Sequence, residues 1–120
     1  EFKPDMIIAN GGSDAHFADH LGSLGLTAKG FFEISRTIAE TANKVCNSKV
    51  ALLMASGYNS TVLPYCWYAL AAGIADPESI KDSIEDYYPA PRDPWQNQQH
   101  VETVLNQLKK ILRGYWKCFP

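Results

Sequence analysis

Two short runs of purely apolar residues, separated by one amphipathic stretch, constrain the fold of this chain most strongly. The runs are Met6–Ala9 and Val50–Ala55, and the residues between Thr27 and about Lys44 carry apolar side chains at helical spacing. Thr27 is of a type that is preferred at a helix N-cap. Short, continuously apolar runs are typical of parallel strands that are buried on both faces. The pattern therefore predicts two parallel strands joined by a helix, which is an α/β arrangement.

The rest of the chain divides into an apolar helix and a more polar extension. A second helix is expected from about Thr61 to Ala72, with Pro64 in its first turn, where proline is tolerated. Residues 1–75 then form a β-α-β-α core. Residues 76–120 are expected to add three parts to this one domain: a polar helix from Asp76 to near Asp86, a proline-rich wrap over residues 87–94, and an amphipathic helix from about Asn97 to Leu112.

Composition and charge exclude several classes of protein. The 120 residues are 46% hydrophobic and 20% charged, and their net charge of −2 gives no sign of a nucleic-acid-binding surface. No apolar run reaches the roughly 18 residues that a membrane span needs. The three cysteines are widely spaced, which is not a disulfide framework or a paired metal motif. A cytoplasmic, reducing location is therefore expected.

Polar, glycine-containing segments follow both predicted strands. Ligands bind beyond the carboxyl ends of strands in such sheets, so Asn10–His20 and Ser56–Asn59 should lie side by side if the strands are neighbours. The first segment carries carboxylate and imidazole groups, which suit zinc, at Asp14, His16, Asp19 and His20. The alternative is a polar loop whose aspartates cap turns or a helix.

Tyr58 follows Gly57 at the end of the second predicted strand. A glycine at a strand end often permits positive φ or close approach of the backbone. A phenol at this place can donate a hydrogen bond into a cleft, as a group that stabilises an oxyanion does. The other interpretation is a tyrosine whose ring packs under the next helix, and the pattern alone leaves both open.

The sequence of these segments resembles one enzyme family. Residues 4–16, PDMIIANGGSDAH, followed by DHLG at 19–22 and LT at 26–27, are similar to the "PDlIivSaGfDah…DpLg…LT" block of histone-deacetylase-like zinc amidohydrolases. These enzymes include acetylpolyamine amidohydrolases and acetoin-utilisation proteins. Residues 53–59, LMASGYN, are similar to the "lEGGYn" motif of the same family. The resemblance implies an α/β fold, namely the C-terminal part of an arginase/deacetylase-type parallel sheet flanked by helices.

The resemblance also implies roles for particular residues. Asp14 falls on a ligand of Zn²⁺, and Tyr58 falls on the tyrosine that polarises the substrate carbonyl. His16 and Gly57 fall on supporting loop positions, where His16 is expected either beside the metal ligands or facing solvent. The substrate would be an acetylated amine or acetyl-lysine. The family's paired catalytic histidines and its D-x-H zinc ligands lie upstream of this block, so the rest of the same domain is an expected partner, and these residues alone would be inactive.

Two alternatives remain at the level of the sequence. Ser13, Ala55 and Ser56 depart from the family's Phe, Glu and first Gly, which favours a non-catalytic α/β interaction domain that keeps the scaffold. The other alternative is a small independent hydrolase with Asp14, His16 and His20 as its own metal site. That site requires the three side chains to converge on one ion within about 2.0–2.2 Å.

Overall fold

The computed structural model describes residues 2–22, 24–75, 77–92 and 98–117. The predictions for Asp76, for residues 93–97 and for Cys118 lie outside the described residues. The chain forms two compact units, one over Pro4–Pro91 and one that contains the last helix. All candidate functional residues predicted from the sequence lie in the Pro4–Pro91 unit. None of the helices in the described part is long and apolar enough to cross a membrane.

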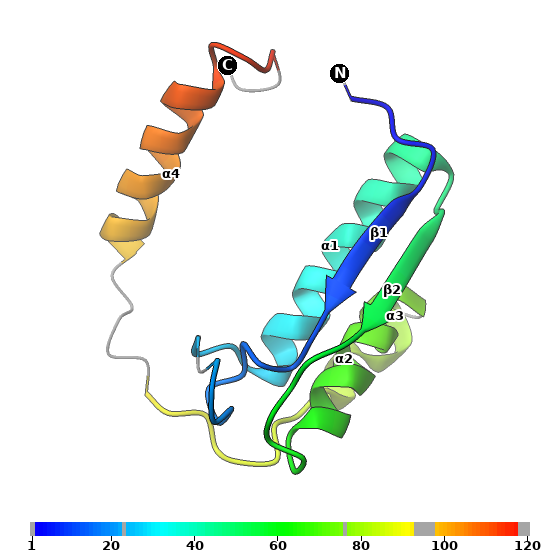
Figure 1. The fold of residues 1–120 in the computed structure, drawn as a ribbon, viewed down its shortest axis with the longest axis vertical. Helices are drawn as coiled ribbons and strands as arrows, with labels where there is room; N and C mark the ends of the chain where they lie inside the picture. The colour runs from blue at the N-terminus through cyan, green and yellow to red at the C-terminus, as the bar shows by residue number, and fades with distance from the viewer. Residues whose placement is uncertain (1, 23, 76, 93–97, 118–120) are drawn as a thin grey trace. The chain divides into compact units, whose positions relative to one another are not determined.

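The two apolar runs form neighbouring parallel strands, as predicted (Figure 1). Strand β1 covers Ile7–Gly11 and strand β2 covers Val50–Met54, in a register that pairs Ile7 with Val50 and Gly11 with Met54. The polar segment predicted to follow the first strand from Asn10 starts later than expected, because β1 continues to Gly11. The carbonyl of Gly11 accepts a hydrogen bond from the Ala55 N–H at 2.9 Å, which extends the pairing past the end of β2.

Helices α1 and α2 follow the two strands, and they pack closely against each other. Helix α1 covers Ala28–Cys46, with Thr27 as its N-cap through a 3.1 Å bond from the Gly30 N–H, and α2 covers Leu63–Ala75. A side chain on Gly73 of α2 would place its Cβ 2.1 Å from Ser35 Oγ of α1. Glycine at that position therefore permits the close approach of the two helices.

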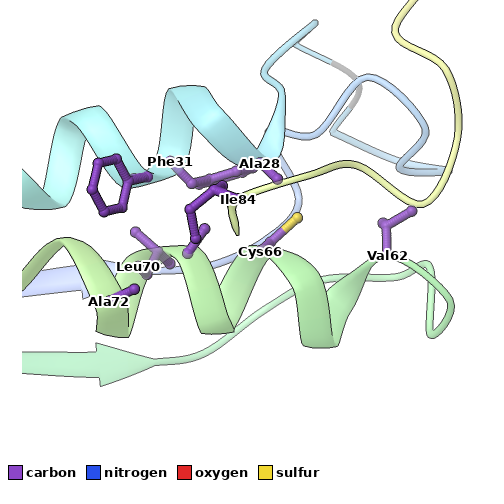
Figure 2. Packing of buried hydrophobic residues seen from close by; sticks show 9 residues of the cluster. Ala28, Phe31, Val62, Cys66, Leu70, Ala72 and Ile84 are labelled. Carbon is purple, nitrogen blue, oxygen red and sulfur yellow. The ribbon is translucent and has the colours of Figure 1, made fainter. Parts of the chain in front are cut away.

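The core lies between these helices and one face of the sheet. Figure 2 shows Ala28 and Phe31 of α1 beside Cys66 and Leu70 of α2, with Ile84 between the two helices. Cys66 is fully buried, as expected for a small core residue, and this burial raises the pKa of its thiol to about 12. Strand β2 contributes Leu52 and Met54 to the same cluster.

The opposite face of the sheet is open. Ile8 is 66% exposed and Leu53 is 53% exposed. The prediction that both strands are buried on both faces is therefore wrong within the described residues. The reason is that α1 and α2 lie on the same side of the sheet, so alternate side chains of each strand have no layer against them (Figure 1).

The polar extension is less helical than predicted. Helix α3 covers only Pro77–Ile80 and is followed by the 3₁₀ helix η1, Lys81–Ser83, so the chain leaves helical conformation before Asp86. Residues 87–92 form no helix or strand, as their prolines predict. The final amphipathic helix is confirmed as α4, Gln98–Leu112, in the second unit.

Candidate functional site

The loops that follow β1 and β2 are joined by hydrogen bonds, so the prediction that they lie side by side is confirmed. The backbone N–H of Ser13 donates to the carbonyl of Ser56 at 3.1 Å. Further from the strands, the side-chain amide of Asn59 donates to the carbonyl of Ala18 at 2.8 Å. Asn59 is 7% exposed, so this bond is a partly buried connection between the two loops.

Asp19 is the strongest link between the loops. Its Oδ1 accepts the N–H groups of Leu21 and Gly22 at 2.9 and 3.0 Å, and its Oδ2 accepts the N–H of Tyr58 at 2.8 Å. Burial alone would raise the pKa of this carboxyl, but the backbone N–H bonds outweigh it and lower the pKa from 3.8 to about 2. Asp19 is thus a buried, ionised residue whose hydrogen bonds hold the two loops together. This confirms the turn-capping interpretation for this residue.

Asp14 differs from Asp19 because its carboxylate has no fixed partner. Within the described residues, no hydrogen-bond donor contacts its oxygens, and the side chain is only partly buried. The backbone around it is tightly packed: a Cβ on Gly22 would lie 1.8 Å from the Asp14 carbonyl oxygen, and a Cβ on Gly12 would lie 3.0 Å from its Oδ1. Asp14 therefore carries, on a constrained loop, a carboxylate whose oxygens accept no hydrogen bond among the described residues. Carboxylate oxygens are among the ligands that bind zinc in proteins.

Tyr58 is held by its backbone while its side chain remains accessible. Its N–H is bonded to Asp19, yet the residue is 54% exposed. The interpretation in which its ring packs under the next helix is therefore wrong. Gly57 has φ +132°, and a Cβ there would lie 1.9 Å from Ser13 Oγ. This confirms that the position before Tyr58 needs a glycine.

His16 is neither solvent-facing nor available as a ligand. It is 1% exposed, its Nε2 lies 2.8 Å from Asp86 Oδ1, and its Nδ1 accepts the N–H of Ala18 at 3.1 Å. Both ring nitrogens are therefore occupied within the protein. His20 is exposed, and the described residues contain no group of three or more side chains that could hold a metal. The independent metal site of Asp14, His16 and His20 is thus wrong.

The three departures from the family motifs have different surroundings. Ser13 is fully buried, and its hydroxyl has no hydrogen-bond partner among the described residues. Ser56 adopts φ +64°, the left-handed region in which glycine is favoured. Ala55 is exposed and continues the pairing with Gly11. None of these substitutions prevents the two loops from meeting.

The role of Asp19 matches the turn-capping alternative, since an aspartate just before a turn is a common acceptor for the N–H groups that follow it. One other connecting residue could not be found from the sequence. Asp86 gave no signal at all, because its partner His16 is 70 positions away in the chain.

Comparison with known proteins identifies the family to which the chain belongs. A family model described as histone deacetylase domain matches residues 1–74, which include both strands and both loops. The chain belongs to the histone deacetylase family. The match confirms the predicted family, and the parallel sheet with its helices confirms the predicted α/β fold class. Relatives in this family include proteins named deacetylases.

The relatives of this histone deacetylase family member are considerably longer. A probable deacetylase of Archaeoglobus fulgidus is 32% identical over 99% of this chain, but the match covers 34% of that protein. The acetoin utilization protein AcuC of Bacillus subtilis is 28% identical over 92% of this chain, which covers 35% of that protein. The chain thus spans about a third of the length of these two relatives.

Proposed function

We propose that this chain is part of a zinc-dependent deacetylase that hydrolyses an acetylated amine, either acetyl-lysine or an acetylpolyamine. In this proposal Asp14 is one zinc ligand and Tyr58 is the residue that faces the reacting carbonyl. The observation that carries the proposal is the contrast between Asp14 and Asp19: one carboxylate of the joined loops is saturated with N–H donors, and the other has none among the described residues.

The donor chemistry of Asp14 fits zinc, although one carboxylate cannot hold the ion alone. When bound, zinc polarises a carbonyl oxygen and lowers the pKa of a bound water. The part of Asp14 is to bind the ion from a turn that is closed by the bond from the His16 N–H to the Ser13 carbonyl. At Gly22 the packing against the Asp14 backbone leaves no room for a side chain. The part of Tyr58 is to donate its phenol hydrogen to the substrate oxygen on which negative charge develops. Asp19 serves both by tying the Tyr58 backbone to the loop of Asp14.

The remaining ligands and the general base would come from the rest of the same domain. Three features support this part of the proposal. The exposed face with Ile8 and Leu53 is suited to a further layer, each strand has one edge without a partner among the described residues, and the relatives are about three times as long. We further propose a cytoplasmic location, because the free thiols of Cys46 and Cys66 suit a reducing compartment.

The test uses the intact protein and measures bound metal and turnover separately. Zinc content after dialysis is measured by mass spectrometry, and hydrolysis is followed on an acetyl-lysine peptide and on an acetylpolyamine. The Asp14→Ala variant should lose stoichiometric zinc. The Tyr58→Phe variant should keep its zinc and lose turnover by about 10²–10³-fold, the usual effect of removing one donor to an oxyanion.

The exposed residue Asp82 provides a matched control, because Asp82→Asn removes a carboxylate outside the joined loops. That variant should keep both zinc and turnover. Zinc that survives in Asp14→Ala, or unchanged turnover in Tyr58→Phe, would refute the corresponding role. An intact protein without any bound zinc would instead favour the non-catalytic interaction domain, which the substitutions at Ser13, Ala55 and Ser56 suggest.

A further inference from the structure

The segment that follows η1, Ile84–Tyr88, packs across the ends of both helices and beside the loop of Asp14. Ile84 is 8% exposed and lies in the core between α1 and α2 (Figure 2). The ring of Tyr87 lies 5.6 Å from that of Tyr65 in the first turn of α2. These two contacts fix the segment on either side of Asp86.

Asp86 connects this segment with the N-terminus of α1. Its Oδ1 accepts the N–H of Ala28, the first residue of α1, at 2.7 Å. The first turn of α1 contains no acidic residue, and the Thr27 cap accepts only the Gly30 N–H. Asp86 therefore satisfies an N–H that the helix leaves open and places negative charge at the positive end of its dipole.

The same oxygen of Asp86 also fixes His16. Because Nδ1 of His16 accepts the Ala18 N–H, the ring hydrogen is on Nε2 and is donated to Asp86 over 2.8 Å. The His16 ring lies parallel to the Phe31 ring of α1, with 6.4 Å between their centroids. The side-chain exposures of 1% for His16 and 14% for Asp86 show that this contact is largely shielded from water.

His16 stands two positions after Asp14, so an anchor on His16 acts directly on the loop that carries the candidate ligand. The loop is already held on the other side of Asp14 by the bond from the Ser13 N–H to Ser56. The backbone N–H of His16 also donates to the Ser13 carbonyl at 3.1 Å, which closes a tight turn around Asp14. The conformation of the loop around Asp14 therefore depends on the contacts that hold His16 in place.

We propose that Asp86 is a positioning residue for the metal site, which acts through His16 to hold Asp14 in its binding conformation. The inference rests on the proposed function of Asp14 as a ligand, and it adds a residue distant in sequence to that site. Removal of the Asp86 carboxylate leaves the Nε2–H of His16 and the N–H of Ala28 without their acceptor. The loop around Asp14 then gains alternative conformations, and metal affinity falls because binding must first select the correct one.

The experiment measures the zinc affinity of the intact protein by competition with a chromogenic chelator. Asp86→Ala should weaken zinc binding by about 10–100-fold, as the loss of residues that orient metal ligands does. Asp86→Asn should restore most of the affinity, because its amide oxygen can still accept both hydrogens. The absorption spectrum of the Co²⁺-loaded protein should change in Asp86→Ala and return toward the wild type in Asp86→Asn. Glu85→Ala is the matched control, since it removes a neighbouring exposed carboxylate, and should leave affinity and spectrum unchanged.

Several results would overturn the inference. The first is a folded Asp86→Ala protein with wild-type zinc affinity. In that case, loss of zinc in Asp14→Ala would still support the proposed function of Asp14. If Asp86→Ala does not fold, His16→Phe replaces it, because phenylalanine keeps the aromatic packing against Phe31 and removes both polar contacts. Wild-type zinc affinity in His16→Phe would also overturn the inference. A wild-type protein that binds no zinc, or zinc retained by Asp14→Ala, would refute both proposals together.

Discussion

Replacement of Asp19 by asparagine tests the main connection between the two loops. The carboxylate accepts three backbone N–H groups, from Leu21 and Gly22 on one oxygen and from Tyr58 on the other. Asparagine has one acceptor oxygen, so its NH₂ group must face at least one of these donors. The variant loses one charge-assisted hydrogen bond and leaves a partly buried donor unpaired. We expect the free energy of unfolding to fall by about 2–3 kcal/mol at pH 7.

The pH dependence gives the prediction a second, independent component. The pKa of Asp19 is lowered to about 2 in the folded protein from 3.8. A lowered folded-state pKa contributes stability that is fully present above the unfolded-state pKa and is lost as the pH falls. The difference in stability between the wild type and Asp19→Asn should therefore be constant above pH 5 and narrow as the pH falls from about 4 toward 2.

The assay is urea unfolding of the intact protein, followed by circular dichroism at a series of pH values. Asp82→Asn serves as the control for loss of an exposed carboxylate and should change the free energy of unfolding by less than about 0.5 kcal/mol. If Asp19→Asn at pH 7 is as stable as this control, the hydrogen bonds of Asp19 do not stabilise the connection between the two loops. The same conclusion would follow from a stability difference that stays constant down to pH 2.

The two serine substitutions in the loops provide further tests by the same unfolding assay. Ser56→Gly should stabilise the protein by up to about 1 kcal/mol, because φ +64° strains any residue with a Cβ, although the more flexible unfolded chain offsets part of the gain. Ser56→Val should be clearly destabilising, and a Val variant as stable as the Gly variant would contradict the backbone argument. Ser13→Ala should raise the free energy of unfolding by about 1 kcal/mol, since it removes a buried hydroxyl that has no partner among the described residues. A loss of stability in Ser13→Ala would show that the hydroxyl has a partner in the intact protein.

The sequence predicted the order and type of the main elements because these depend on local patterns. Continuous apolar runs gave both strands, and helical spacing after Thr27 gave α1. The errors are mostly at boundaries: β1 continues to Gly11, and α2 begins at Leu63 instead of Thr61. Pairing with the neighbouring strand carries β1 to Gly11, and before α2 the side-chain oxygen of Asn59 accepts the Thr61 N–H in a turn. The spacing of apolar residues encodes neither contact.

The burial of the strands shows a different kind of limit. An apolar run predicts that both faces of a strand are covered, but the sequence cannot say which layers supply the cover. Ile8 and Leu53 remain exposed in the described residues, since both helices pack on the other face of the sheet. Because Ile8 and Leu53 are apolar, this face of the sheet is suited to packing against a further layer.

By itself, the sequence determined that two polar loops follow two parallel strands, and that Asp14 and Tyr58 are the residues to examine in them. These conclusions rest on local spacing, on the glycine before Tyr58 and on the resemblance of short motifs. Only the tertiary structure decided which polar side chains are free and which are used. Asp19 is saturated by N–H groups of both loops, and His16 is occupied by Asp86 from 70 positions away. The availability of a carboxylate or an imidazole depends on which donors and acceptors the fold brings to it, and distance along the chain carries no information about them.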